Sequence, residues 1–278
     1  MHGSTFRAVK LKTRKMPASS RRSGHLRVEP SPVLVAAMTR IVSACLALIV
    51  SADARASEGT CPALLANARN LVIVTAETMD TTRAWLRVFE RIASSGAWQP
   101  VGGAESAVVG TKGLAWGYPF RGLAQAGEPV KAEGDRRTPA GIYRVGSSFG
   151  FAPSARPGHL VLRPGRSICV DDPTSPAYNS IVFPGPGATP RGEDMGAEPL
   201  YRRGLVVDYP SDAGRRGGSC IFLHVWRGPA SGTAGCVALP EARVAALQEL
   251  SGRGDVAIAI LPRHAVARFE GCLPGGVR

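Results

Sequence analysis

Residues 220–239 read Cys-Ile-Phe-Leu-His-Val-Trp-Arg-Gly-Pro-Ala-Ser-Gly-Thr-Ala-Gly-Cys-Val-Ala-Leu, and they carry most of the information on fold and chemistry in this chain. Residues 221–226 form a short apolar run that predicts a buried strand with His224 in it. A loop with glycine and proline follows, and Gly235 then precedes Cys236. An imidazole that takes the proton of a thiol produces the thiolate, which is the nucleophile in acyl transfer. Gly235 permits a tight turn that lets an amide N–H face an oxyanion.

The pair of His224 and Cys236 has an ordinary structural explanation as well as a chemical one. In apolar segments, histidine and cysteine are more often packed core residues than catalytic groups. The flanking residues favour the chemical explanation. Residues 221–226, followed by Thr-Ala-Gly-Cys-Val-Ala-Leu at 233–239, resemble the active-site signature of the YkuD-like L,D-transpeptidase catalytic domain family. The resemblance implies that His224 is the base and that Cys236 is the nucleophile.

A second stretch with the same resemblance lies upstream. Residues 129–143 read Pro-Val-Lys-Ala-Glu-Gly-Asp-Arg-Arg-Thr-Pro-Ala-Gly-Ile-Tyr, and the composition alone predicts a solvated loop that runs into a strand from Gly141. In the YkuD-like family a similar Glu-Gly-Asp…Thr-Pro-x-Gly segment leads into a core strand near the site. We interpret its glycines and Pro139 as architectural. Lys131 and Arg136 are candidates for contacting substrate carboxylates.

The resemblance implies a fold, a substrate class and a mechanism. The fold class is mainly β (α+β), a β-sandwich or barrel like that of the L,D-transpeptidase catalytic domain, with a few short helices. The substrates are peptidoglycan stem peptides, and the reaction runs through a thioester on Cys236 with no cofactor and no metal. Backbone N–H groups around Gly235 would hold the oxyanion. The side chains expected to bind the substrate or position the histidine lie in the same segment: Thr233, Ser231, Arg227 and Trp226.

Two positions depart from the family pattern. Many members carry His or Lys directly before the Gly-Cys and Arg or Asn two residues after the cysteine, whereas this chain has Ala234 and Ala238. The interval of 12 residues from His224 to Cys236 is also short for the family. The acceptor of the acyl group therefore stays open. Hydrolysis of the same thioester, as in an L,D-carboxypeptidase or amidase, is one alternative, and a non-catalytic cell-wall-binding module is another.

Net charge gives little support to a nucleic-acid partner. The chain of 278 residues has 34 Lys and Arg against 21 Asp and Glu, a formal net charge of +13. Of these, 10 basic and 2 acidic residues lie in residues 1–56, so the remainder carries only +5. A body this mildly basic predicts no nucleic-acid binding. The sequence does not indicate an oligomeric state.

Residues 1–56 are interpreted as a non-structural extension followed by a signal peptide. Residues 1–37 are rich in Arg, Lys, Ser and Pro and have no apolar periodicity. Residues 38–56 combine a basic start, an apolar run and a final Ala-x-Ala, which is the layout of a secretory signal and too short for a membrane span. A long basic region that starts at Met1 and a lipoprotein signal that ends at Cys45 are the alternatives.

The expected mature protein is a single catalytic domain at residues 57–278. We expect it to be exported to the periplasm or cell wall of a bacterium, with no membrane span once the signal is removed. Removal of the signal leaves five cysteines: Cys61, Cys169, Cys220, Cys236 and Cys272.

An odd number of cysteines in an oxidising compartment leaves one free thiol, and a nucleophilic Cys236 has to be that thiol. Cys61 and Cys272 lie near the two mature ends and are a natural pair. Cys169 would then pair with Cys220. Connectivity does not follow from sequence alone, and buried unpaired thiols are the alternative.

Hydrophobic patterns predict the other elements. Residues 70–75 predict a strand, and residues 80–92 predict a helix with Trp85, Val88, Phe89 and Ile92 on one face. Further strands are expected at residues 98–101, 107–110, 201–209 and 255–261, and a helix at residues 243–250.

Few other polar residues are candidates for chemistry. Asp208 is a candidate for orienting His224, a task that a backbone carbonyl or a hydroxyl can also perform. Asp171 and Asp172 are adjacent and would point to opposite sides of an extended chain, so we expect a structural role rather than a metal site. Two further histidines are expected to be incidental: His159 and His264.

Overall fold

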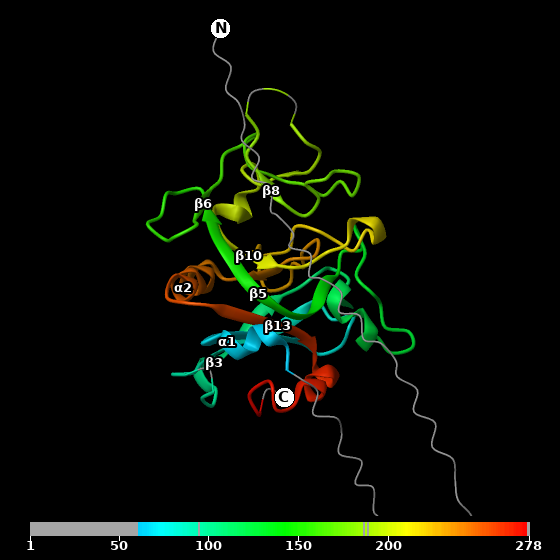
Figure 1. Ribbon diagram of the computed structural model, residues 1–278, viewed down its shortest axis with the longest axis vertical. Coiled ribbons are helices and arrows are strands. Elements are labelled where there is room, and N and C mark those ends of the chain that lie inside the picture. Colours follow the sequence, from blue (N-terminus) through cyan, green and yellow to red (C-terminus); the bar gives the residue numbers. More distant parts are fainter. Residues whose placement is uncertain (1–60, 94, 186, 188, 277–278) are drawn as a thin grey trace, which may run out of the picture. The chain divides into compact units, whose positions relative to one another are not determined.

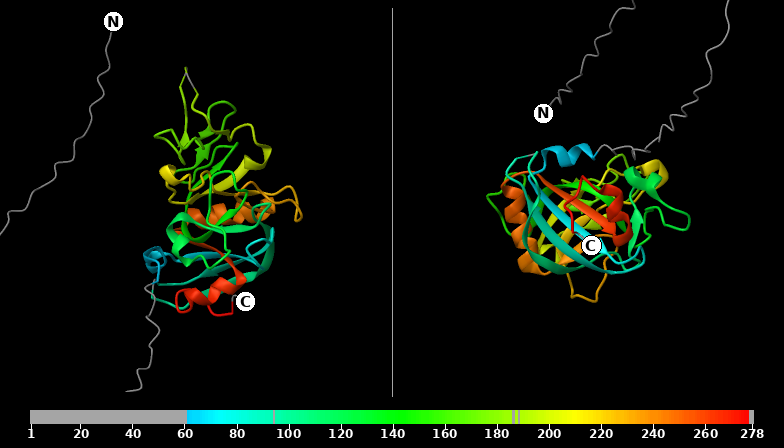
Figure 2. Two further views of the ribbon diagram at one scale, coloured as in Figure 1. Left: turned by 90° about the vertical axis from the view of Figure 1, so that its right-hand side faces the viewer. Right: turned by 90° about the horizontal axis from the view of Figure 1, so that it is seen from below.

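A circuit of hydrogen-bonded strands closes the central sheet into a barrel. The computed structural model describes residues 61–276 except residues 94, 186 and 188. The strands follow the order β10-β11-β12-β3-β2-β1-β13-β5, and β5 pairs back with β10 (Figures 1 and 2). Their bounds are β1 (Asn70–Ala76), β2 (Arg83–Glu90), β3 (Gln99–Val108), β5 (Thr138–Gly150), β10 (Arg203–Asp208), β11 (Phe222–Val225), β12 (Val237–Leu239) and β13 (Val256–Pro262).

Smaller elements lie outside this circuit. β4 (Leu114–Trp116) and β6 (Leu160–Val161) pair with β5, while β7 (Ile168–Cys169) pairs with β8 (Ile181–Val182) and β9 (Glu193–Asp194) in a separate sheet. Residues 151–200 lie at one end of the barrel, at the top of Figure 1 and of the left view of Figure 2. The helical segments are α1 (Ala63–Asn67), η1 (Tyr118–Leu123), η2 (Pro199–Arg202), η3 (Ala213–Arg215), α2 (Glu241–Gly252) and η4 (Arg263–Phe269).

Two hydrophobic clusters form the core. β1 and β13 are parallel neighbours that are buried almost throughout, which explains their continuous runs of Val, Ile, Leu and Ala. They belong to the main cluster. The second cluster contains the candidate nucleophile and consists of Phe149, Leu162, Cys169, Met195, Tyr201, Phe222 and Cys236.

Helix α2 is tied to the barrel by one buried polar side chain. Gln248 is 1% exposed, and its Nε2 donates to the carbonyl oxygens of Phe149 in β5 and Gly204 in β10, both at 2.9 Å. These bonds satisfy an amide that would be costly to bury alone. The helix therefore braces the strand pair that leads into β11.

The helix expected at residues 80–92 is wrong, because these residues form strand β2. Ala84, Leu86 and Val88 are buried, whereas Trp85 between them is 52% exposed. This alternation fits the period of two residues that a strand has when one face is covered. Pairing with β1 on one side and β3 on the other overrides the helical spacing seen in the sequence.

The two strands expected at residues 98–101 and 107–110 are one strand, β3. The glycine pair between them does not end it. Gly102 has a φ of +73°, and the register with β2 shifts between Leu86 and Val88. A β-bulge at this point absorbs the extra residues, and glycine adopts the positive φ without strain.

The predicted fold class and the remaining predicted strands and helix are confirmed. The fold is mainly β with a barrel core and a few short helices. The strands predicted at residues 70–75, 201–209, 221–226 and 255–261 correspond to β1, β10, β11 and β13, and the predicted final helix is α2. The segment 129–143 does run from a loop into a core strand, β5.

Both expected disulfides are confirmed. Cys61 pairs with Cys272 across Cα atoms 5.4 Å apart, and Cys169 pairs with Cys220 across Cα atoms 6.0 Å apart. Among the described cysteines Cys236 is the free one. The first bridge joins the two ends of the described chain, and the second ties β7 to the segment before β11.

The described helices are all too short or too polar to cross a membrane. The expected signal peptide and the rest of residues 1–56 lie outside the described residues.

Candidate active site

Parallel pairing of β11 and β12 places the chain around Cys236 next to the strand that carries His224. His224 lies beside Ala238 in the register of the two strands. Cys236 directly precedes β12, and its Sγ accepts a hydrogen bond from the Phe222 N–H at 3.3 Å. The Phe222 and Cys236 side chains pack in the same hydrophobic cluster, and side chains two residues apart on a strand share a face, so His224 points the same way as Phe222. The imidazole and the thiol therefore lie on one face of two adjacent strands.

The environment of His224 fixes which ring nitrogen carries the proton. The side chain is 5% exposed, and its Nδ1 lies 2.8 Å from the carbonyl oxygen of Val225. Because a carbonyl oxygen only accepts, Nδ1 is the protonated nitrogen and Nε2 holds the lone pair. Burial lowers the pKa of His224 below its usual 6.5. The imidazole is thus neutral near pH 7 and can take a proton at Nε2.

Asp208 does not orient His224, contrary to the expectation from sequence. Residue Gly204, not Asp208, is the β10 partner of His224. The Asp208 carboxylate instead forms an ion pair with Arg144 at 2.6 Å. The backbone carbonyl of Val225 performs the orienting task.

The thiol of Cys236 is buried and protonated at neutral pH. The residue is 6% exposed. Burial, with a smaller effect from the negative charge of Glu193, raises the pKa of Cys236 to about 12, against the lowering effects of the Phe222 N–H hydrogen bond and of the nearby Tyr201 hydroxyl. Neutral thiol and neutral imidazole are therefore the resting forms of this pair.

Two threonine hydroxyls hold the backbone of Cys236. Thr138 Oγ1 donates to the Cys236 carbonyl oxygen at 3.0 Å, and Thr233 Oγ1 donates to the same oxygen at 2.6 Å. The Gly235 N–H in turn donates to Thr233 Oγ1 at 3.1 Å. Gly235 has a φ of +156°, a conformation that residues with a Cβ rarely adopt. Hydrogen bonds from Thr138 and Thr233 at the Cys236 carbonyl, and the bond from the Gly235 N–H to Thr233, therefore hold the turn that carries the sulfur.

A cleft of about 390 Å³ opens beside His224. It contains each of the side chains that the sequence predicted for substrate binding, namely Trp226, Arg227, Ser231 and Thr233. Ala234 and Ala238 also line it, so methyl groups occupy the two positions where many family members have polar side chains.

Tyr201 belongs to the site although the sequence gave no indication of it. Its ring packs edge-on against the His224 ring with centroids 5.1 Å apart, and its hydroxyl donates to Glu193 Oε1 at 2.9 Å. Burial raises the pKa of Tyr201 well above its usual value of 10.0, so the phenol keeps its proton as a donor. Glu193 and Glu198 line the same cleft. Tyr201 lies in η2, Glu198 caps that helix and Glu193 lies in β9, and no motif or spacing connects them with β11.

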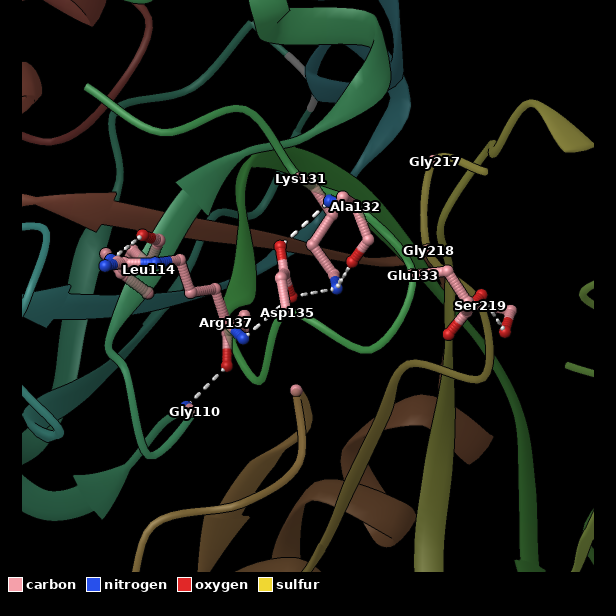
Figure 3. Close-up of polar contacts among 12 residues, drawn as sticks. Gly110, Leu114, Lys131, Ala132, Glu133, Asp135, Arg137, Gly217, Gly218 and Ser219 are labelled. Carbon is pink, nitrogen blue, oxygen red and sulfur yellow. Dashed lines mark hydrogen bonds and ion pairs between the residues drawn. The ribbon is translucent and has the colours of Figure 1, made fainter. Parts of the chain in front are cut away.

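The loop before β5 is held by buried and half-buried charges, as Figure 3 shows. Lys131 is 6% exposed, and its Nζ contacts Asp135 Oδ1 at 2.5 Å. Asp135 Oδ2 also accepts from the Ala132 N–H at 2.8 Å. Lys131 therefore serves Asp135 and not a substrate carboxylate, against the expectation. Arg136 does line the cleft.

The remaining polar candidates lie elsewhere. His159 Nδ1 is 2.8 Å from the Ser148 hydroxyl, and His264 pairs with Glu128 at 2.7 Å. Asp172 accepts from the Thr174 N–H at 2.9 Å, which is a turn contact.

The chain matches a known family over most of its folded part. The sequence model of the L,D-transpeptidase catalytic domain family, YkuD, matches residues 101–259. That match spans more than half of the 278 residues and includes both His224 and Cys236. The chain therefore belongs to this family of L,D-transpeptidase-type cell-wall enzymes, which confirms the expectation from sequence.

Other comparisons add little to the family match. A search of curated proteins finds no match. Among solved structures, the helical cell shape determining protein Pgp2 from Campylobacter jejuni is similar, at 17% identity and a TM-score of 0.34. A point mutant of the same protein is similar at 19% identity and the same TM-score. Each pairing covers 70% of this chain and 48% of the other, so the chain spans about half the length of these neighbours.

Proposed function

We propose that this protein is an L,D-transpeptidase that transfers acyl groups between peptidoglycan stem peptides through a thioester on Cys236, with His224 as the base. The observation that supports it best is the placement of the two side chains. The imidazole and the thiol share one face of paired parallel strands, and His224 opens onto the cleft. The tautomer fixed by Val225 directs the basic nitrogen away from the backbone.

In the proposed reaction, Nε2 of His224 takes the proton of Sγ as the sulfur attacks the carbonyl carbon of the third residue of a donor stem. This carbonyl belongs to the amide that links the third residue to the terminal D-residue. The tetrahedral intermediate collapses, the carbon–nitrogen bond breaks, and the imidazolium gives its proton to the departing amine of the terminal D-residue. The thioester that remains is then attacked by the amine of an acceptor stem. This second attack restores the thiol and forms a crosslink.

The shifted pKa values of Cys236 and His224 keep both groups neutral until a substrate is bound, so we expect proton transfer to accompany the attack on the substrate. Burial raises the pKa of Cys236 and lowers that of His224, so a thiolate–imidazolium pair is disfavoured at rest. Negative charge on sulfur is supported by the Phe222 N–H at 3.3 Å, and the nearby Tyr201 hydroxyl, which donates to Glu193, also lowers the pKa of Cys236. Such fixed donors act most strongly where water is excluded, and losing one typically costs about 3 kcal/mol of barrier.

Hydrolysis of the same thioester is the second candidate function. Ala234 and Ala238 place methyl groups on the cleft wall at positions where many family members have polar side chains, so no side chain there is available to hold an acceptor stem. Water would then be the second nucleophile, and the enzyme would shorten stems as an L,D-carboxypeptidase.

Products distinguish these functions. The purified domain is incubated with tetrapeptide-containing muropeptides and the products are measured by mass spectrometry, with Cys236→Ala as the matched inactive variant. Crosslinked dimers made by the wild type alone support the transpeptidase, and tripeptides alone support the hydrolase. Products that are the same for wild type and variant would exclude catalysis by Cys236 and favour a non-catalytic wall-binding module.

We further propose that the protein works outside the cytoplasm, in the periplasm or cell wall. This follows from the substrate and from the signal-like residues 38–56. Two disulfides in the described chain support an oxidising compartment. Cell fractionation of the full-length chain with a C-terminal tag would test it, and recovery only from the cytoplasm would contradict it.

A further inference from the structure

Cys220 has a backbone conformation that is rare for its residue type. Its φ is +56°, in the left-handed region that favours glycine. A non-glycine residue there costs about 1–3 kcal/mol and persists where its surroundings hold it. The residue lies two positions before the strand that carries His224, so the cause of this conformation bears on the candidate active site.

Each interacting group of Cys220 is engaged by a different part of the fold. Its sulfur is bonded to Cys169. Its N–H donates to Asn179 Oδ1 at 3.0 Å. Its carbonyl oxygen accepts a hydrogen bond from the thiol of Cys236 at 3.4 Å. The disulfide and Asn179 thus hold Cys220 in place, and the carbonyl oxygen of Cys220 contacts the candidate nucleophile.

The segment 220–222 makes two backbone hydrogen bonds to this sulfur. The Cys220 carbonyl accepts from the S–H, and the Phe222 N–H donates to Sγ at 3.3 Å. The carbonyl can bond only to the neutral thiol, because it accepts the S–H proton. The N–H donates to the sulfur of both the thiol and the thiolate, and its bond to the thiolate is the stronger one. The position of this short segment therefore sets both the place and the acidity of the thiol.

The residues just before Cys220 are anchored as well. The Ser219 hydroxyl donates to Glu133 Oε2 at 2.7 Å, a contact drawn in Figure 3. Gly218 packs so closely on Lys131 that an added Cβ would lie 2.8 Å from its side chain. The loop before β5 thus supports the chain up to residue 219, and the disulfide holds the residue that follows.

We propose that the Cys169–Cys220 disulfide is a positioning device for the Cys236 thiol, with Asn179 as its second support. It holds Cys220 in the left-handed conformation and so keeps the segment 220–222 against the sulfur. This inference rests on the proposed role of Cys236 as nucleophile. Activity then depends on the oxidised state of two cysteines that take no part in the reaction.

The expected change has a definite sign. When the bridge is absent, we expect Cys220 to relax toward negative φ and the two hydrogen bonds to the sulfur to break, while the side chains packed around Cys236 keep the thiol buried. The lost N–H stabilised the thiolate and the lost carbonyl stabilised the thiol. A hydrogen bond to a charged atom is about twice as strong as a neutral one, so the thiolate loses more. The pKa of Cys236 rises, and its alkylation at a fixed pH slows.

Three paired substitutions test this in the full chain. Cys169→Ser with Cys220→Ser removes the bridge without creating an unpaired cysteine, and mass spectrometry of the peptide that contains Cys236 reports its alkylation separately from that of Cys45. Cys61→Ser with Cys272→Ser is the matched control, because it removes the other described bridge, which joins the chain ends. Cys169→Ser with Cys220→Gly is the rescue variant, because glycine adopts a φ of +56° without strain.

Two rates are measured for each protein: alkylation of Cys236 by iodoacetamide against pH, and product formation from tetrapeptide muropeptides. We expect the serine pair at 169 and 220 to slow alkylation about threefold to tenfold. It should also lower kcat about tenfold with little change in KM, because a misplaced nucleophile affects the reaction more than binding. The control pair should change neither rate, and the glycine variant should recover most of both.

Equal alkylation rates and kcat in wild type and the serine pair would overturn the proposal, and so would a glycine variant no faster than the serine pair. If the serine pair does not fold, Asn179→Gly decides the matter. It keeps the disulfide and tolerates the φ of +60° at residue 179, but removes the acceptor of the Cys220 N–H. Slower alkylation supports the proposal and an unchanged rate overturns it. Alkylation reports on the thiol without any substrate, so an inactive wild type with a bridge-dependent thiol would reject the proposed function alone.

Discussion

The hydroxyl of Thr138 donates a hydrogen bond to the carbonyl oxygen of Cys236 at 3.0 Å, although 98 positions separate the two residues in sequence. The same hydroxyl accepts from the Gly110 N–H at 2.9 Å. Thr138 is fully buried at the start of β5. The segment with the Thr-Pro-x-Gly pattern therefore supports the candidate nucleophile directly, through the backbone of Cys236.

We expect Thr138→Val to lower both stability and activity. Valine keeps the branched shape but leaves the buried Gly110 N–H without an acceptor, which typically costs about 1–3 kcal/mol. The Cys236 carbonyl keeps only its bond from Thr233. Urea unfolding and product formation would measure the two effects. Thr138→Ser is the control, because it retains the hydroxyl, and a serine variant as impaired as the valine variant would contradict this explanation.

The pH dependence of activity should reflect a buried neutral base. Burial lowers the pKa of His224 below 6.5, so the imidazole stays neutral, and able to accept the thiol proton, at pH values where a solvent-exposed histidine is already charged. Activity should therefore fall only as the pH drops through this lowered value. The measurement is kcat/KM against pH. If the acidic limb has its midpoint above pH 6.5, a His224 with a pKa lowered by burial does not set the pH dependence.

Alkylation of the thiol should respond to pH at the other end of the scale. The pKa of Cys236 is raised to about 12, so the thiolate fraction keeps growing at pH values above the ordinary 9.0 of a cysteine. The rate of reaction with iodoacetamide should rise without a plateau through that value. A plateau near 9.0 would show a thiol of ordinary acidity.

The sequence was sufficient for the fold class and for the two residues on which the proposed site is built. His224 and Cys236 lie in one short segment, so a strand followed by a loop was enough to place them near each other. The odd number of cysteines, with the free thiol assigned to Cys236, led to both disulfides. Local pattern was enough for His224 and Cys236 because they are close in sequence. The disulfides were predictable because assigning one of five cysteines as the free thiol leaves few ways to pair the other four.

Contacts between distant segments were not predictable in the same way. Tyr201 reaches His224 only because η2 and β10 fold against β11, and the sequence holds no periodicity that relates them. Residues 80–92 show helical spacing, yet sheet pairing on both sides makes them a strand. Asp208 was a reasonable partner for His224 by position, but its strand register places Gly204 there and Arg144 neutralises the carboxylate.

Removing one oxygen from Tyr201 should weaken the nucleophile without disturbing the packing. Tyr201→Phe keeps the ring against His224 and removes a hydroxyl that donates to Glu193 and lowers the pKa of Cys236. We expect the pKa of Cys236 to rise and product formation to fall about tenfold or more, as for other donors to a developing negative charge. Stopped assays with muropeptides and the alkylation rate measure both. Tyr118→Phe is the matched control, since its hydroxyl contacts Asp212 outside the site, and an equal loss in both variants would reject a specific role.

The turn before the sulfur should tolerate no side chain. Gly235 has a φ of +156°, and a Cβ added there would lie 3.3 Å from the carbonyl oxygen of Arg137. Gly235→Ala therefore combines a strained backbone, worth about 1–3 kcal/mol, with a displacement of Cys236 relative to His224. We expect a lower free energy of unfolding and a loss of activity larger than the loss of folded protein explains. Gly122→Ala is the matched control, because an added Cβ at that position has no heavy atom within 4 Å. If Gly235→Ala reacts with iodoacetamide and with muropeptides as fast as Gly122→Ala does, the turn does not position the thiol.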